Sequence, residues 1–253
     1  MTLCSKITRC LTKNKELNLC LNKPTISWST NKDHAHAKNL YEEILQLDQN
    51  NIDAYNSLAQ WIQNLSKNHY FNNIDVDQYF LEWKQLYEKA LEIDPDDYIT
   101  NFYIGILYYK VKADHPDFIH KALEYLLKAE QADSNTAVLF NIAVVYDEIA
   151  NYKDSEKYYL KIIDVNKEND NEIIADAIRE QNLKVYNNLA ILSKKQDNID
   201  DTIRYYKEGL NIDSKNFTFL YNLGLILMNI GRCKQAIKLF NKAILCKIDI
   251  NNY

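Results

Sequence analysis

The segment WKQLYEKALEIDP, residues 83–95, decides the fold of this chain. Its residues Trp83, Tyr87 and Ala90 follow one another at steps of four and three, which places them on one face of a helix. Pro95 comes directly after this pattern, where it ends a helix without breaking the internal hydrogen bonds. The segment therefore predicts an amphipathic helix with a small residue in its apolar face.

The same pattern recurs along the chain. In the other copies a small residue takes the place of Trp83. It is followed four residues later by a bulky, mostly aromatic one, then by an anchor residue and, in most copies, an acidic or amide residue. The other copies are Ala37–Tyr41–Ile44–Asp48, Ala122–Leu126–Ala129–Asp133, Ser155–Tyr159–Ile162–Asn166, Thr202–Tyr206–Gly209–Asp213 and Ala236–Phe240–Ala243. Successive anchors, Ala90 included, are 46, 39, 33, 47 and 34 residues apart. The chain is therefore a helical repeat in which three spacings carry insertions.

A second helix with its own signature precedes most copies. It contains a bulky residue followed by a small one, and the small residue lets two helices cross closely. The examples are Leu58-Ala59, Ile104-Gly105, Ile142-Ala143, Leu189-Ala190 and Leu223-Gly224. One register explains all four glycines, because Gly105 and Gly224 take the first small position, Gly209 the second, and Gly231 the turn between paired helices.

This arrangement resembles the tetratricopeptide repeat (TPR) family, whose helix–turn–helix repeat is about 34 residues long. The resemblance implies an all-α, right-handed α-solenoid with about five full repeats and a degenerate N-terminal one. We expect the solenoid over residues 32–248, a basic N-terminal segment over 1–31 with at most a degenerate helix, and a tail over 249–253. The insertion at 166–181 predicts a helical extension. The insertion at 63–77 predicts a loop, either tolerated or used as a contact.

Composition excludes several classes of protein. Only 4 Gly and 3 Pro are too few for the turns of a many-stranded β fold. A net charge of −5 does not indicate the excess of basic residues that binds nucleic acid. No apolar run approaches the length of a membrane span. Five cysteines near the two ends, without a secretory segment, indicate a reduced cytoplasmic location. The basic residues 1–24 leave an organelle transit peptide open as an alternative.

No motif in the sequence predicts catalysis. Phosphate loops, nucleophile elbows and zinc-binding helix motifs are missing. His34 and His36 are two apart on an expected helix and point to different sides. His115 and His120 have no nearby cysteine or acidic cluster at the spacing of a metal site. We therefore expect no enzyme activity, no metal site and no cofactor.

Three asparagines lie two residues before the first small position of their repeats: Asn141, Asn188 and Asn222. In TPR proteins that bind extended peptides, this asparagine often hydrogen-bonds the ligand backbone. The resemblance therefore implies a ladder of amides that holds a peptide. The alternative is that the same amides tie neighbouring helices together.

The remaining positions that the resemblance places on the concave surface are largely apolar. They are Phe102, Ile106, Tyr109, Phe140, Val144, Asn187, Ile191, Tyr221, Leu225 and Met228. Such a groove suits an apolar side chain or an amphipathic helix of a partner protein. The alternative is packing of a tightly wound superhelix on itself.

One well-known use of TPR domains does not fit. The clamp that binds acidic chaperone tails resembles a set of Lys, Asn and Arg residues over three repeats. Here Lys184 and Asn141 match that set, whereas Phe102, Ile106 and Asn188 depart from it. We count Lys184 among the groove residues and do not predict chaperone-tail binding.

The sequence thus predicts a non-catalytic scaffold that binds a peptide or helix of another protein in the concave groove. The alternative is a structural subunit of a larger complex, held through solenoid ends and convex faces. The last helix, Lys234–Cys246, leaves Ile237, Ile244 and Ile248 without an expected cover. Since terminal repeats need a polar outer face, we expect this end to stack on a second copy or a partner subunit.

Overall fold

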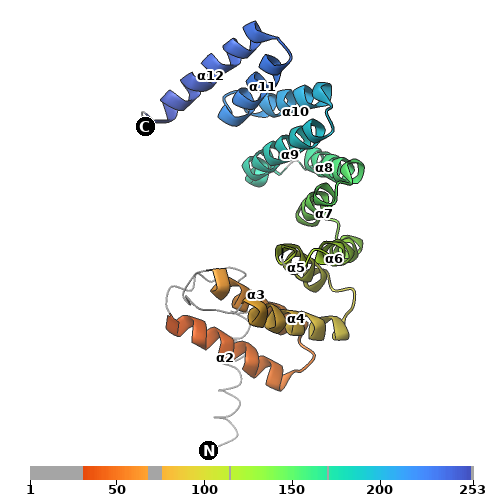
Figure 1. Cartoon of the computed structure of the whole chain (residues 1–253). Coiled ribbons are helices and arrows are strands. Elements are labelled where there is room, and N and C mark those ends of the chain that lie inside the picture. The colour runs from red at the N-terminus through yellow and green to blue at the C-terminus, as the bar shows by residue number, and fades with distance from the viewer. Residues whose placement is uncertain (1–30, 68–75, 114, 170, 252–253) are drawn as a thin grey trace, which may run out of the picture. The chain divides into compact units, whose positions relative to one another are not determined.

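The computed structural model describes residues 31–67, 76–113, 115–169 and 171–251 (Figure 1). Within these ranges every regular element is a helix, and no strand occurs. The chain divides into two compact units, Met1–Asp133 and Ser134–Tyr253. The prediction of an all-α fold is confirmed.

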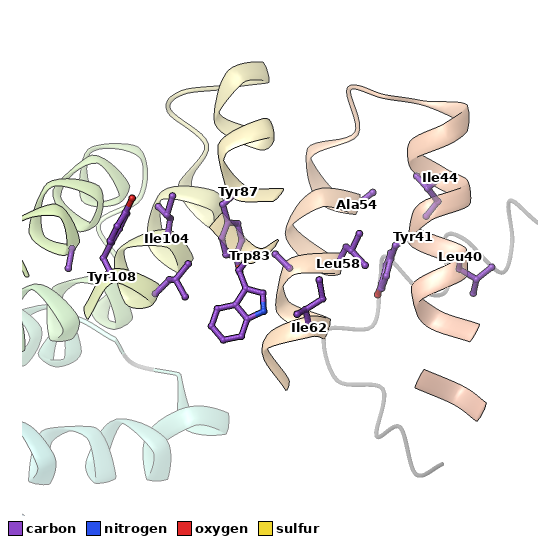
Figure 2. Packing of buried hydrophobic residues seen from close by; sticks show 13 residues of the cluster. Leu40, Tyr41, Ile44, Ala54, Leu58, Ile62, Trp83, Tyr87, Ile104 and Tyr108 are labelled. Atoms are coloured by element: carbon purple, nitrogen blue, oxygen red, sulfur yellow. The ribbon is translucent and has the colours of Figure 1, made fainter. Parts of the chain in front are cut away.

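In the described residues of the first unit, one single helix is followed by two helix pairs. These are α2 (Asn31–Leu47), the pair α3 (Ile52–Lys67) and α4 (Val76–Ile93), and the pair α5 (Tyr98–Lys110) and α6 (Phe118–Ala132). Figure 2 shows their core, in which Tyr41, Leu58, Trp83, Tyr87 and Ile104 lie buried in one cluster. The segment that decides the fold thus supplies the centre of this core.

The second unit contains three helix pairs. They are α7 (Thr136–Glu148) with α8 (Tyr152–Lys167), α9 (Ala175–Lys195) with α10 (Ile199–Ile212), and α11 (Phe217–Asn229) with α12 (Cys233–Asn251). A short 3₁₀ helix, η1 (Glu172–Ile174), precedes α9. Over the ranges that the structure describes, five helix pairs follow the single helix α2, which matches the predicted five repeats and a leading part.

Asparagine side chains fix where most helices of the second unit begin. Asn135, Asn151, Asn198 and Asn216 precede α7, α8, α10 and α11, and each side-chain oxygen accepts a backbone N–H of the first turn. Such a cap satisfies a donor that has no partner inside the helix and stabilises the helix by about 1 kcal/mol. The many asparagines of this chain therefore have a structural use at helix starts.

The small residues allow paired helices to approach closely, as predicted. A Cβ atom added at Gly105 of α5 would lie 2.8 Å from Cγ of Leu126 in α6. A Cβ atom added at Gly224 of α11 would lie 2.6 Å from the ring of Phe240 in α12. Gly231 has φ +79° in the turn between α11 and α12, the left-handed conformation expected there.

The structure also describes part of the insertions. Helix α9 begins at Ala175, so the second half of the insertion at 166–181 is the helical extension that the sequence predicts. Helix α3 continues to Lys67 and α4 begins at Val76, while residues 68–75 and 1–30 lie outside the described residues. The domain boundaries at 31/32 and 248/249 stay predictions.

Candidate functional site

An apolar pocket of about 640 Å³ lies between the two helices of the last pair, α11 and α12. Figure 1 shows this pair in blue at the C-terminal end of the chain. The pocket is lined by Phe217, Tyr221, Leu225 and Met228 of α11 and by Phe240, Ala243, Ile244 and Lys247 of α12.

The sequence builds the α11 wall by simple helical spacing. Phe217, Tyr221, Leu225 and Met228 follow at steps of four, four and three, so they share one face. The rings of Phe217 and Tyr221 stack with centroids 5.8 Å apart and planes 9° apart. This wall is thus ordered by contacts between its own side chains.

The α12 wall follows from the same spacing. Phe240 lies against Tyr221, with ring centroids 5.8 Å apart, and lines the pocket from the side of α12. Ala243 is buried and small, so it adds depth to the pocket instead of filling it. Ile244 stands at the edge with 55% of its surface exposed.

Exposed apolar side chains give this site its chemical character. Tyr221, Met228 and Ile244 all remain open to solvent although they are large and apolar. The charged lining residue is Lys247, whose Nζ lies 5.4 Å from the ring centroid of Phe217. A contiguous apolar hollow with a polar rim is typical of a site that binds another molecule.

Three predicted groove residues, Tyr221, Leu225 and Met228, meet in this pocket. The equivalent residues of the earlier pairs lie on α7 and α9. Phe140 packs its ring edge-on against Tyr159 of the paired helix at 5.7 Å, and Val144 is half-buried. Ile191 is 39% exposed on α9.

Three further groove residues, Phe102, Ile106 and Tyr109, lie half-buried on α5 in the first unit. Phe102 stacks on Tyr98 at 5.8 Å, and Lys112 places its Nζ 3.7 Å from the Tyr109 ring centroid. These residues therefore form a local aromatic surface on that unit.

The predicted asparagine ladder makes hydrogen bonds within the protein. Asn188 donates from Nδ2 to the hydroxyl of Tyr159 at 3.0 Å, and the Asn222 side chain bonds to Tyr206. Asn141 donates to the carbonyl oxygen of Ala137, one turn earlier in its own helix, at 2.8 Å. Asn188 and Asn222 thus bond to the helix that precedes their own, as the alternative interpretation expects, and peptide binding by the ladder stays a prediction.

The last two predicted residues, Lys184 and Asn187, lie on α9. Lys184 is exposed and pairs with Glu180 at 2.8 Å, one turn away. The side-chain oxygen of Asn187 is buried and accepts no hydrogen bond from the part of the chain that the structure describes. A buried acceptor without a partner costs free energy, on the order of 1–3 kcal/mol.

Phe217, Phe240, Ala243, Ile244 and Lys247 line the pocket but were not among the predicted site residues. Phe217 was within reach of the sequence, because it precedes Tyr221 by one helical turn. The α12 residues depend on how the second helix packs against the first. Their role in the pocket needs the three-dimensional structure.

The described ranges show neither a metal cluster nor a membrane-spanning helix. Across those ranges, no group of three or more His, Cys, Asp or Glu side chains could hold a metal ion. His34 and His36 lie on α2, but their side chains are outside the described residues. Of the helices that the structure describes, none is both long and apolar enough to cross a membrane.

A sequence model of the tetratricopeptide repeat matches residues 136–169 and 217–245. The chain contains tetratricopeptide repeats. The two matches coincide with the pairs α7–α8 and α11–α12, so the family model matches two of the repeats that the sequence predicts. Curated proteins compared with this TPR protein gave no match.

Several solved structures are similar to this TPR protein. PilF of Pseudomonas aeruginosa has a TM-score of 0.59 at 17% identity, covering 92% of this chain and 90% of that one. YrrB, described as a TPR protein with an unusual peptide-binding site, has a TM-score of 0.58 at 14% identity, covering 83% and 93%. Cut9 in an APC/C hetero-tetramer with Hcn1 has a TM-score of 0.53 at 12% identity, covering 84% and 36%. Similarity at these identities establishes the fold.

Proposed function

We propose that this TPR protein is a non-catalytic scaffold that binds a peptide or helix of a partner protein. The first helices of the last three pairs, α7, α9 and α11, carry the groove residues, and the pocket between α11 and α12 is the main anchor. TPR arrays in general are protein-interaction modules, and a scaffold of this kind supports many different partners. The observation that carries the proposal is the apolar pocket itself.

The pocket supports binding for a physical reason. Burying apolar surface contributes about 25 cal/mol per Å², so an open hollow lined by Tyr221, Met228 and Ile244 gains free energy when a partner covers it. Its size is in the range of ordinary ligand sites, about 300–1,000 Å³. Aromatic and Met side chains are also the residues enriched at protein interfaces.

The intramolecular bonds of Asn188 and Asn222 argue against hydrogen bonds from these asparagines to a bound peptide. An amide that already holds a tyrosine hydroxyl is a poor candidate for a ladder that grips a peptide backbone. We therefore place the binding energy in apolar contacts. The asparagines instead hold the first helices at a fixed position under those contacts.

A second function is favoured by exposed residues outside the pocket. Ile237 and Leu245 on α12 are more than half exposed and do not line the hollow. They suit the alternative of a structural subunit, in which this face of α12 packs on a second copy or a partner subunit. The two functions differ in which side of α12 must stay apolar.

A pair of matched substitutions tests the proposal. Ile244→Glu places a carboxylate at the pocket edge, and Ile173→Glu makes the same change on η1, where the side chain is 92% exposed and far from the lining residues in sequence. Both proteins should keep their helical circular dichroism. In affinity capture from lysate of the source cells, followed by mass spectrometry, Ile244→Glu should lose partners that Ile173→Glu retains. Equal partner sets for both variants would contradict a pocket-based function, and loss only with Ile237→Glu would favour the structural subunit.

A further inference from the structure

The pairs α7–α8 and α11–α12 are equivalent residue by residue. Helices α7 and α11 begin at 136 and 217, and α8 and α12 begin at 152 and 233, so both starts differ by the same 81 positions. The shared offset places Ile163 opposite Ile244 in this comparison, and Asn166 opposite Lys247. The first pair thus shows what happens at these positions when a helix covers them.

In the first pair that cover is α9, which packs against α8. Under it, Ile163 is 3% exposed and Asn166 is 7% exposed. The equivalent Ile244 on α12 is 55% exposed. The face of α12 that bears Ile244 is therefore equivalent to a face that, in the first pair, packs against a covering helix.

The polar contact between α8 and α9 indicates which polar side chains a covering helix carries. Nδ2 of Asn166 donates to Oε1 of Gln181 at 2.9 Å and to Oδ1 of Asn182 at 2.7 Å. The buried amide is thus matched by two neutral acceptors on the covering helix. At the equivalent place α12 has Lys247, a cationic donor with up to three N–H groups. The acceptors that match a partly desolvated ammonium are carboxylates.

The size of the pocket indicates which apolar side chain a covering helix can carry. The position equivalent to Ile162 is Ala243, and both are fully buried. The shorter alanine side chain leaves room beside Phe240, where the hollow of about 640 Å³ lies. A covering helix can therefore insert a large apolar side chain between α11 and α12.

The charged residues in the sequence around the pocket are all cationic. Residues 214–248 contain no Asp or Glu. Their cations are Lys215, Arg232, Lys234, Lys238, Lys242 and Lys247. The net charge of the whole chain is −5, so the last repeat is basic within an acidic protein. Lys234 lies one turn from Ile237 and Lys247 one turn from Ile244, so cations flank the exposed apolar residues of α12.

We propose that the pocket between α11 and α12 binds an amphipathic helix of a partner protein that carries Asp or Glu beside its apolar stripe. The apolar stripe fills the hollow above Ala243, and an acidic residue meets Lys247 as Gln181 and Asn182 meet Asn166. This inference rests on the proposed function and adds the chemistry of the ligand to it. A hollow, in contrast to a flat apolar face, fits a helix better than a lipid surface.

The test is a selection of peptides on the full-length chain. The probe is a display library of helical peptides about five turns long, with apolar residues at i, i+4, i+7 and i+11. Glu, Gln and Lys occur equally often at the flanking positions. We expect the selected peptides to carry Glu beside the apolar stripe. Binding of these peptides should be lost with Ile244→Glu and retained with Ile173→Glu.

A charge exchange then tests the role of Lys247 itself. Lys247→Glu should weaken binding of an acidic selected peptide by about tenfold, and replacing the flanking Glu of that peptide by Lys should recover most of the loss. Lys207→Glu, an exposed change on α10, is the control and should have little effect. Equal affinity of Lys247→Glu for acidic and basic peptides would overturn the proposal.

The remaining outcomes separate this inference from the proposed function. Selected peptides that need Ile244 but show no preference for Glu would overturn the acidic ligand and leave the binding function standing. A selection that yields no Ile244-dependent peptide would contradict both. Sedimentation with phosphatidylcholine–phosphatidylserine vesicles that depends on Lys247 would make the occupant a membrane, and self-association that depends on Ile244 would make it a second copy. Either result overturns the proposal.

Discussion

Gly209 of α10 lies so close to Phe219 of α11 that a Cβ atom added at the glycine would come within 2.2 Å of the ring. Phe219 is buried and packs edge-on against Tyr206, with centroids 5.7 Å apart. The ring therefore cannot move away without losing this contact. The interface between two successive pairs depends on the absence of a side chain at Gly209.

Gly209→Ala should therefore destabilise the protein, although alanine is normally favoured over glycine inside a helix by about 1 kcal/mol. Overpacking against Phe219 should cost on the order of 1–3 kcal/mol. Thermal unfolding followed by circular dichroism measures the loss. Combining Gly209→Ala with Phe219→Leu should restore part of it, and a stabilised single mutant would show that the contact does not constrain the interface.

Two buried tyrosines should respond in opposite directions to loss of the hydroxyl group. The Tyr87 hydroxyl is buried without a hydrogen-bond partner in the described part of the chain, so Tyr87→Phe should stabilise by about 1 kcal/mol. The Tyr205 hydroxyl donates to Oε1 of Glu156 at 2.5 Å, so Tyr205→Phe should destabilise by about 2 kcal/mol. Urea titration of both variants gives the sign. Shifts of the same sign would contradict this assignment of the two hydroxyls.

Stability should fall in alkaline solution. Burial raises the pKa of Tyr205 above its ordinary value of about 10, and the hydrogen bond to Glu156 raises it further. The unfolded chain then loses this proton at lower pH than the folded one, so the stabilisation is complete below about pH 10 and is lost as the pH rises through the folded pKa. Tm measured from neutral pH upward should decrease above about pH 10. Tyr205→Phe should make that decrease less steep, and an unchanged slope would assign the effect to other groups.

The asparagines of the predicted ladder should differ in their effect on stability. Asn188→Ala removes the hydrogen bond to Tyr159 between α9 and α8 and should cost about 1 kcal/mol. Asn141 bonds only one turn back in its own helix among the bonds that the structure shows, so Asn141→Ala should change stability by less than about 0.5 kcal/mol. Denaturant unfolding of both variants checks this. If Asn141→Ala were the more damaging change, Asn188 would not be the tie between the helices.

Much of the fold was predictable because successive repeats pack their two helices in the same way. Small residues such as Gly105 and Gly224 mark helix crossings, and each crossing was confirmed by a close approach of the paired helix. The uncovered face of the last helix was also predicted. Ile237 and Ile244 are exposed there, whereas the side chain of Ile248 lies outside the described residues.

The pocket was only half predictable. Tyr221, Leu225 and Met228 follow from position in the repeat, but the other wall of the hollow lies on α12, where Ala243 is shorter than its equivalent Ile162 in α8 and Phe240 also lines the pocket. Those facts depend on the separation of two helices. The tie between Asn188 and Tyr159 joins residues 29 apart in sequence, and no local pattern records it. Binding by the groove stays a prediction.

The most direct measurement of the central claim is site-specific photo-cross-linking. A benzophenone amino acid is placed at Leu225 inside the pocket and, as a matched control, at Ile173 on η1. After irradiation in the source cells, the Leu225 probe should give a discrete cross-linked product with a partner protein, and the product should disappear when Ile244→Glu is added. A product that persists with Ile244→Glu, or equal products from both probe positions, would contradict a binding site between α11 and α12.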